Sequence, residues 1–281
     1  MITGAILGCE YALLAASWGV IFKVTKTFHF AHAVVYTLGA YFALIAFNSL
    51  GMALIQALTL GVLGASLAGC LIEVLLYKPL RRAGATHEGI LIASLGLLLI
   101  IEMLIVLLIG DGPQSIDYHA TLFTSGDIAF TNTQAYSAGI DVLLIAGLLC
   151  FMSFTRTGRT MEAVAINVEL AALVGIGVQK IFNYAFLVGS ALAGLAGALA
   201  LVDRGIDPFA GTMPITMAFI AVIVGGVESI LGGAMAGFIL GMSINLCAAV
   251  IPSEFQHVAA FSLVILLLIV RPEGLLGIRS R

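Results

Sequence analysis

Long apolar runs separated by short polar connections occupy most of this 281-residue chain. A helix that crosses a bilayer needs about 20 mostly apolar residues, because the hydrocarbon layer is about 30 Å thick. The runs are continuous and do not alternate, which favours helices over the strands of a barrel. The pattern predicts about nine spans, at residues 4–22, 28–48, 52–76, 88–109, 138–154, 180–201, 213–226, 231–251 and 257–270. The seventh is short and ends in glycine, so a re-entrant segment is the alternative there.

We therefore expect an all-α, polytopic transmembrane helical bundle that forms one domain over residues 1–281. The composition agrees: 61% of the residues are hydrophobic and 10% are charged, whereas about a quarter are charged in soluble proteins. The 32 glycines suit helices that pack closely in lipid. The four cysteines lie one per apolar run without metal or redox spacing, and we interpret them as inert buried thiols: Cys9, Cys70, Cys150 and Cys247.

Basic residues lie in alternate connections, and Lys and Arg in short loops stay on the cytoplasmic side. The expected cytoplasmic set is Lys23, Lys26, Lys78, Arg81, Arg82, Arg156, Arg159, Lys180, Arg271, Arg279 and Arg281. The loop at 110–137 carries three aspartates and no Lys or Arg, so it should face outward. The N-terminus is then outside and the C-terminus cytoplasmic. Arg204 is the exception, and we expect Asp203 and Asp207 to neutralise it.

The segment 155–176 is polar although it lies between two apolar runs, and the charge pattern places it in the cytoplasm. Gly158 can end the incoming helix, and helical periodicity predicts an amphipathic helix after it. Its apolar face would hold Met161, Val164, Ala165, Val168 and Ala172, opposite Arg159, Glu162 and Glu169. A face built from alanine and valine suits a protein groove better than lipid. Docking to a partner is favoured, and packing against the same chain is the alternative.

Ionisable residues inside spans cost about 2.5–3.5 kcal/mol on insertion scales, so each is a functional candidate. We interpret Glu10 as a solvated carboxylate near the outer membrane face. Glu73 should form an ion pair with Lys78 or Arg81, which follow it in the chain. Glu102 has no charge nearby in sequence, so we expect it to be protonated or paired with His29 or His32. A transport role and structural hydrogen bonding are both open for Glu102.

His29 and His32 are three residues apart and face the same side of a helix. No third ligand follows at a recognisable interval, so a metal site is not expected. Together with nearby aromatic residues they could line a passage for a small zwitterion with an apolar side chain. Aromatic packing, with His32 bonded to a backbone carbonyl, is the equal alternative. The candidate substrate-pathway residues are His29, Phe30, His32, Tyr36, Tyr41 and Glu102.

Several short segments occur in a familiar order: Phe28-His29-Phe30-Ala31-His32, Leu38-Gly39-Ala40-Tyr41, Tyr77-Lys78-Pro79-Leu80-Arg81, Gly158-Arg159, Leu173-Val174-Gly175-Ile176, the glycine-rich run 189–197 and Arg271-Pro272-Glu273-Gly274. The set resembles permease subunits of branched-chain amino acid ABC importers over nearly the whole chain. Three positions depart from that family's pattern. His29 replaces a typical asparagine, Ala33 replaces a typical glycine, and Met161-Glu162 lies where a basic residue is common. The first two leave the substrate open, and the third could change which ATPase is accepted.

The resemblance implies an importer in the bacterial inner membrane. Its partners would be a second permease subunit (a related chain or a second copy), two cytoplasmic ATPases and a periplasmic or extracellular binding protein. The segment 155–176 would couple to the ATPases through Gly158, Arg159, Glu162, Ala163, Ala165 and Asn167. This chain has no G-x-x-x-x-G-K-[ST] loop, so partners would use the ATP and magnesium. We expect no cofactor on this chain.

The sequence offers no nucleophile elbow or catalytic triad pattern, so we do not expect an enzyme. The outer loop 110–137 lacks basic clusters that would attract nucleic acid, and it could dock a binding protein. The expected function is a translocation pathway for branched-chain amino acids. One alternative keeps the importer and changes its cargo to urea, short amides or aromatic acids. Another is an ion-coupled secondary transporter with Glu102 and His32 as a proton relay.

Overall fold

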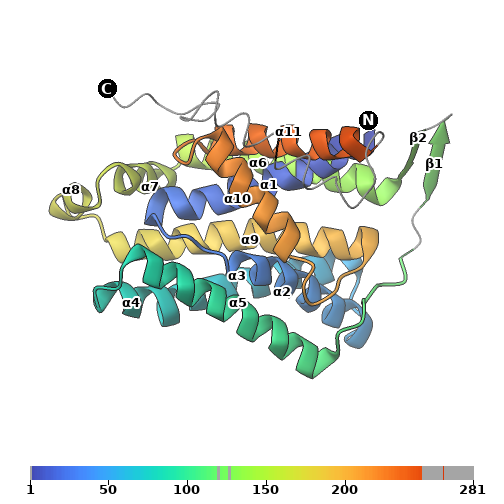
Figure 1. Ribbon diagram of the computed structural model, residues 1–281, viewed down its shortest axis with the longest axis horizontal. Coiled ribbons are helices and arrows are strands. Elements are labelled where there is room, and N and C mark those ends of the chain that lie inside the picture. The colour runs from blue at the N-terminus through green and yellow to red at the C-terminus, as the bar shows by residue number, and fades with distance from the viewer. Residues whose placement is uncertain (1, 119–120, 126–127, 249–261, 263–281) are drawn as a thin grey trace.

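The computed structural model describes residues 2–118, 121–125, 128–248 and 262 (Figure 1). Its helices are α1 (Ile2–Thr25), α2 (His32–Leu44), α3 (Leu54–Ile72), α4 (Lys78–Arg82), α5 (His87–Ile109), α6 (Asn132–Phe154), α7 (Arg156–Ile166), α8 (Val168–Leu173), α9 (Val178–Arg204), α10 (Thr212–Gly225) and α11 (Ile230–Ala248). Two π-helical turns, η1 (Ile45–Ser49) and η2 (Glu73–Tyr77), extend α2 and join α3 to α4. The strands β1 (Leu122–Ser125) and β2 (Ile128–Thr131) pair antiparallel within the predicted outer loop. The sequence pattern did not predict this hairpin.

Seven helical stretches among the described residues are long and apolar enough to cross a membrane: Ile2–Thr25, His32–Ser49, Leu54–Arg82, His87–Ile109, Asn132–Phe154, Val178–Arg204 and Ile230–Cys247. They correspond to seven of the predicted spans. The predicted span 213–226 is α10, whose 14 residues rise about 21 Å and fall short of the hydrocarbon thickness. The predicted span 257–270 lies outside the described residues. The described residues are mostly helical, with a β-hairpin as the exception to the predicted all-α class, and the count of nine spans and the orientation of the termini stay predictions.

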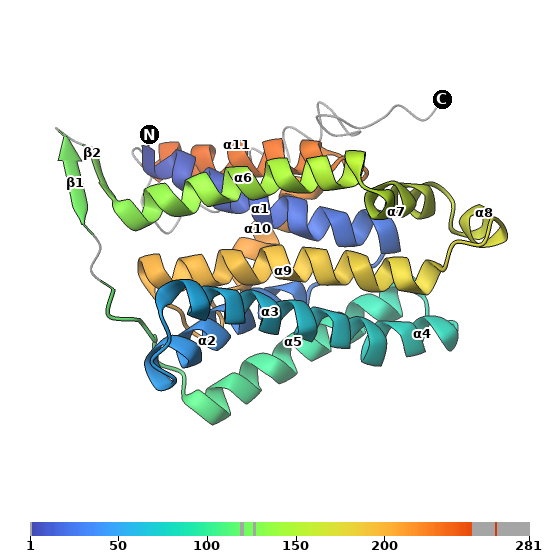
Figure 2. The same ribbon diagram turned by 180° about the vertical axis from the view of Figure 1, so that it is seen from behind.

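The basic connections gather at one end of the bundle. α4, α7 and α8 lie together at the left of Figure 1, and the β1–β2 hairpin lies at the opposite end; the reverse view in Figure 2 agrees. α4 carries Lys78, Arg81 and Arg82, and α7 carries Arg156 and Arg159. This separation is the one that a cytoplasmic preference of Lys and Arg produces. We therefore refer to the end with α4, α7 and α8 as the basic end.

Between α1 and α2, residues 26–31 form an irregular segment that enters the middle of the bundle (Figure 1). Irregular backbone at membrane depth is tolerated only where protein surrounds it and supplies hydrogen bonds. His29 and Ala31 are fully buried. The Trp18 indole donates to the His29 carbonyl oxygen (3.1 Å), and the Ala31 amide donates to Ser94 Oγ (2.9 Å). The predicted span 28–48 is thus helical only from the start of α2.

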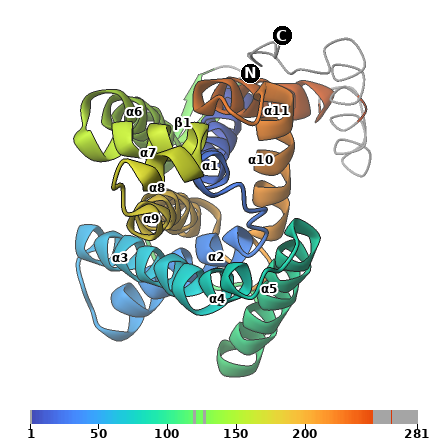
Figure 3. The ribbon, with the colours of Figure 1, turned by 90° about the vertical axis from the view of Figure 1, so that its left-hand side faces the viewer.

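Small residues set how closely the central helices approach. Seen end-on, α1 lies among the other long helices, with α9 beside it (Figure 3). A Cβ added to Gly189 of α9 would lie 2.7 Å from the Ile21 side chain and the Ser17 carbonyl oxygen of α1. A Cβ on Gly237 of α11 would lie 2.6 Å from the Tyr11 carbonyl oxygen. Because a side chain at either glycine would force helices apart, their role in close packing is confirmed.

Candidate functional site

A hydrogen-bonded cluster holds the irregular segment against α5. His29 Nδ1 lies 2.8 Å from Tyr77 Oη, and Tyr77 donates to Ser94 Oγ at 2.8 Å. Because the Tyr77 proton is directed at Ser94, we assign the proton of His29 to Nδ1, from which it donates to Tyr77. All three side chains are fully buried. The cluster joins α5, which is largely exposed, to the core of the bundle.

His32 bonds to a side chain of α1. Its Nε2 lies 3.0 Å from Ser17 Oγ, and Ser17 donates to the Leu14 carbonyl oxygen at 2.8 Å. His32 therefore donates from Nε2. The backbone carbonyl considered in the sequence analysis is not its partner, because the helix presents the Ser17 hydroxyl instead. The rings of His29 and His32 have centroids 5.2 Å apart, so the structure does bring these two residues together.

Glu102 meets neither histidine. Its Oε1 accepts a hydrogen bond of 2.7 Å from Thr212 Oγ1, at the first residue of α10. The expected pairing with His29 or His32 is therefore wrong, because those imidazoles use their protons on Tyr77 and Ser17. The carboxyl of Glu102 is 5% exposed and holds α5 to α10. Its hydrogen bond gives it a structural partner, and its role in transport stays a prediction.

The remaining predicted pathway residues point to separate neighbours. The Phe30 ring packs against Phe219 of α10, with centroids 5.0 Å apart. Tyr41 is buried, and its hydroxyl has no hydrogen-bond partner among the described residues. Tyr36 Oη donates to Glu10 at 2.9 Å. The six candidates do not form one continuous lining among the described side chains. Their use as a substrate passage stays a prediction.

An ion pair that the sequence analysis missed joins α1 to α9 at the end opposite the basic end. Arg204 Nη1 lies 2.9 Å from Glu10 Oε2, and Nη2 lies 2.6 Å from Oε1. Arg204 Nη2 also donates to Tyr36 Oη at 3.0 Å. Glu10 is thus not the solvated carboxylate that was expected. Glu10 also takes the place of the aspartates expected to neutralise Arg204, because the flexible arginine side chain reaches across to α1.

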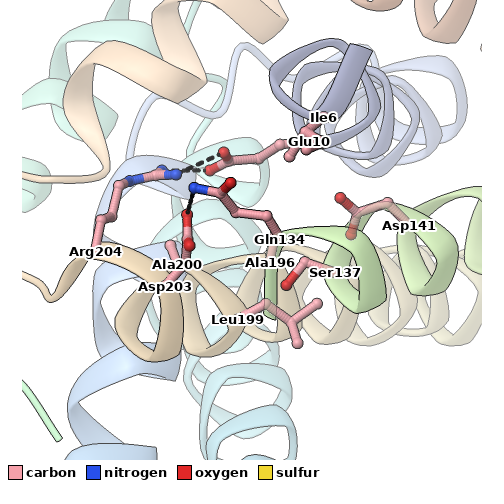
Figure 4. Close-up of a pocket in the computed structure, with 10 residues that line it drawn as sticks. All are labelled: Ile6, Glu10, Gln134, Ser137, Asp141, Ala196, Leu199, Ala200, Asp203 and Arg204. Atoms are coloured by element: carbon pink, nitrogen blue, oxygen red, sulfur yellow. Dashed lines mark hydrogen bonds and ion pairs between the residues drawn. The ribbon is translucent and has the colours of Figure 1, made fainter. Parts of the chain in front are cut away.

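A small cavity, which we call the outer cavity, lies beside this ion pair between α1, α6 and α9 (Figure 4). Its volume is about 30 Å³. Its lining residues are Ile6, Glu10, Gln134, Ser137, Asp141, Ala196, Leu199, Ala200, Asp203 and Arg204. Asp141 projects from α6 toward the space between α1 and α9 (Figure 4), and it is 3% exposed. In the sequence, the signal for this site was Arg204, the one basic residue expected at the outer end.

Glu73 forms the ion pair that the sequence predicts. Its Oε1 accepts from Arg81 and, at 2.8 Å, from Gln179 Nε2 of α9. The Arg81 guanidinium also lies over the Phe182 ring, 4.8 Å from its centroid. Because Glu73 is fully buried, the two donors to Oε1 offset part of the cost of burying the carboxylate, while Oε2 has no partner among the described residues. The role of Glu73 is to fasten η2 and α4 to α9 at the basic end.

The segment 155–176, predicted to be cytoplasmic, consists of two helices and not of one. α6 ends at Phe154, and Thr155 caps α7 by accepting from the Gly158 amide at 2.9 Å. Gly158 therefore lies inside α7 and does not end the incoming helix. Asn167 has extended backbone and caps α8 by accepting from the Leu170 amide at 2.9 Å. The side chain that caps the second helix breaks the periodicity, so the predicted continuous apolar face is wrong.

The apolar face of α7 packs against its own chain. Met161 and Val164 are fully buried, while Ala163 and Ala165 are half-buried. Glu162 accepts from Lys23 Nζ of α1 through both oxygens, at 2.8 and 2.7 Å. Glu162 is therefore engaged within the chain by the last turn of α1. Of the six predicted ATPase-coupling residues, Arg159 and Asn167 are exposed, and the other four are buried or half-buried.

By contrast, α8 and its flanks project beyond the bundle at the basic end (Figures 1 and 2). We call residues 166–175 the projecting segment. Its large apolar side chains lie at the surface: Ile166 is 80% exposed, Leu170 58%, Leu173 84% and Val174 70%. Contiguous exposed apolar surface of this kind marks an interaction site.

Among the residues that the structure describes, no group of three His, Cys, Asp or Glu side chains could hold a metal ion. The four cysteines are free. Cys9 is buried as expected, whereas Cys150 is exposed and Cys70 and Cys247 are half-buried. Their description as buried thiols is therefore right only for Cys9, because the faces of α3, α6 and α11 that carry the others lie toward the outside of the bundle.

The apolar helices of spanning length, with basic residues at one end, define a multi-pass inner-membrane transport protein. The chain belongs to the family described as "Branched-chain amino acid transport system / permease component", whose profile matches residues 1–270. It is 30% identical to the high-affinity branched-chain amino acid transport system permease protein LivH of Escherichia coli K12, over 99% of this chain and 94% of LivH. Identity to the corresponding permease protein BraD of Pseudomonas aeruginosa is also 30%, over 99% and 94%. A galactofuranose transporter permease protein, YtfT of E. coli K12, is 27% identical over 69% of this chain and 63% of YtfT.

Proposed function

We propose that this chain forms the translocation pathway of an ATP-driven, binding-protein-dependent importer for branched-chain amino acids. A second permease subunit (a related chain or a second copy) would complete the pathway, two cytoplasmic ATPases would supply the energy, and a periplasmic or extracellular protein would deliver the substrate. The family and the two 30% identical relatives, both named as branched-chain amino acid permeases, support this cargo.

The projecting segment is the observation that carries the proposal. It presents Ile166, Leu173 and Val174 at the surface of the basic end, on a segment that extends past the long helices (Figure 1). Burying one such side chain in a partner groove is worth about 1.5–3 kcal/mol. A docking ATPase would therefore gain affinity chiefly from α8 and its flanks. The proposed ATPase contact is therefore centred on residues 166–175 and not on the middle of α7, where most of the coupling residues were expected.

The way α7 is anchored supports force transmission. Met161 and Val164 are fully buried, and Glu162 holds Lys23 of α1. A push on α8 would therefore pass through α7 into α1, which lies at the centre of the bundle (Figure 3). An unanchored loop would absorb the same push by bending. The arrangement supports an alternating pathway driven from the cytoplasm.

The test is to replace Leu173 by aspartate in the importer expressed with its ATPase. Burying a charge in an apolar groove is costly, so co-purified ATPase should fall at least tenfold, and ATP-dependent uptake should fall with it. Leu122→Asp is the matched control, because Leu122 is 63% exposed at the opposite end, in β1. ATPase retention by Leu173→Asp equal to that of the control would count against the proposal. Uptake in liposomes under a proton gradient without any ATPase would favour the ion-coupled alternative instead.

A further inference from the structure

We propose that the outer cavity binds the zwitterionic part of the transported amino acid, with Asp141 taking the α-ammonium group and Arg204 taking the α-carboxylate. This inference rests on the proposed function and adds the residues that would recognise the substrate. It assigns a use to the one cavity whose lining combines three acidic side chains with a basic one among the pockets of the described residues (Figure 4).

The hydrogen-bond inventory of the cavity leaves acceptors in excess. Arg204 places both of its Nη atoms on Glu10. Asp203 accepts from Gln134 at 3.4 Å. Asp141, in contrast, has an oxygen, Oδ1, without a hydrogen-bond partner among the described residues, although it is 3% exposed. Buried carboxylates are costly unless a donor meets them. The complement of this site is therefore a small group with several N–H donors and a positive charge.

An ammonium group meets these requirements in size and chemistry. A cavity needs about 10–15 Å³ to hold one water-sized group, and the outer cavity has about 30 Å³. An ammonium group presents three donors, and hydrogen bonds between ions are about twice as strong as neutral ones. Asp141 and the neighbouring Ser137 hydroxyl both line the cavity on α6.

The opposite wall already shows how a carboxylate is bound. The Glu10 side chain lies on the Arg204 guanidinium with two parallel hydrogen bonds, the geometry that suits a carboxylate. Tyr36 Oη reaches both partners, at 2.9 and 3.0 Å. Glu10 thus occupies the place of the ligand α-carboxylate. A substrate that displaced it would gain the same donors, which makes Glu10 an internal competitor of the substrate.

The apolar part of the cavity suits a branched side chain. Ile6 of α1 and Leu199 of α9 line it together with two alanines of α9. The present volume admits an ammonium group but not a whole amino acid, so the proposal requires the cavity to widen when the substrate enters. Opening it requires one of the three walls to move.

The proposal assigns this movement to α6. Apolar grooves flank it on both sides: one of about 620 Å³ toward α9, and one of about 280 Å³ toward α1 and α11. At its outer end, the bonds from Thr131 and Gln134 to Asp203 are both 3.4 Å, longer than the 2.7–3.2 Å range of good hydrogen bonds. Because α6 carries Asp141, its movement would open and close the ammonium subsite.

Two substitutions with opposite expected signs test the site in the complete importer, reconstituted in proteoliposomes with ATP inside. Asp141→Asn should lower uptake of leucine from its binding protein at least tenfold, and Asp141→Glu should restore part of it. Glu10→Gln should raise uptake of free leucine without binding protein at least fivefold, because the internal competitor is weakened. Glu88→Gln, which neutralises an exposed carboxylate in the first turn of α5, is the matched control and should change neither rate.

Each outcome decides the matter. A purely structural ion pair predicts that Glu10→Gln lowers uptake, and that result overturns the inference, as does normal uptake by Asp141→Asn. If Asp141→Asn fails to assemble with the ATPase, the sign of the Glu10→Gln effect decides alone. Loss of wild-type uptake when choline replaces external Na⁺ and K⁺ would assign the site to an inorganic cation and overturn the inference. Failure of the wild-type importer to move any amino acid with ATP would instead overturn the proposed function.

Discussion

Neutralising Glu162 tests whether α7 and α1 move as one body. Both carboxylate oxygens of Glu162 lie on Lys23 Nζ, at 2.8 and 2.7 Å. Lys23 is 16% exposed and Glu162 is 44% exposed, so solvent screens one side of the pair. Exposed ion pairs contribute about 0.2–1 kcal/mol, and the two-point contact places this one near 1 kcal/mol. Glu162→Gln should therefore increase the detached population of α7 about fivefold.

The apolar anchor is larger than the ion pair. Burying a side chain such as Met161 or Val164 contributes about 1.5–3 kcal/mol each, and both are fully buried. Glu162→Gln should thus loosen α7 without detaching it, whereas Met161→Ala, at about 2–5 kcal/mol, should detach it. We expect graded uncoupling: the number of amino acids moved per ATP hydrolysed falls about two- to fivefold in Glu162→Gln and further in Met161→Ala.

The assay compares uptake and ATP hydrolysis on the same proteoliposomes. The reversed pair Lys23→Glu with Glu162→Lys should recover at least half of the coupling lost in either single variant. Glu88→Gln is the control, since Glu88 is an exposed carboxylate in the first turn of α5 and forms no ion pair among the described residues. If the reversed pair is as defective as the single variants, or if Glu162→Gln couples normally, α1 does not receive the push through this contact.

Three further outcomes follow from the buried contacts. Tyr77→Phe removes the acceptor of the His29 proton. Because a buried donor without a partner costs about 1–3 kcal/mol, the midpoint of thermal unfolding in detergent should fall. An unchanged midpoint would exclude the assigned tautomer of His29. Glu102→Gln keeps an acceptor for Thr212 and should preserve ATP-driven uptake, whereas a proton relay through Glu102 would lose it. Gly189→Ala crowds α1 and should lower the yield of folded protein on size-exclusion chromatography, while Gly96→Ala, where a Cβ meets nothing within 4 Å, should not.

Much of the helical layout could be predicted because hydrophobicity over 20 residues is a local property. The predicted span 88–109 matches His87–Ile109 within a residue. The sequence analysis missed the break at Asn167 between α7 and α8. Asparagine is a favoured helix cap, and its position three residues before Leu170 was the signal for a new helix. The prediction gave more weight to the apolar periodicity, which continues past Asn167, than to the capping residue. In the structure the cap prevails and the segment forms two helices.

The candidate site could be predicted only in part. Glu73 and Arg81 are only eight residues apart on one continuous helical stretch, η2 and α4, so the long arginine side chain can reach back to the carboxylate. Glu102 found Thr212 of α10, a partner 110 positions away that no spacing rule indicates. The first contact could be predicted because its residues are close in sequence, and the second could not because its residues are far apart.

By itself, the sequence determined that this is a membrane protein, where its apolar spans lie and at which end its basic residues gather. These properties depend on the hydrophobicity and charge of each segment separately. Only the tertiary structure decided which helices face each other. Glu10 meets Arg204 at a separation of 194 residues, and Lys23 meets Glu162 at 139. Those pairings depend on which small-residue faces pack together. The sequence of one helix shows which of its sides is polar but does not show which helix will pack against it.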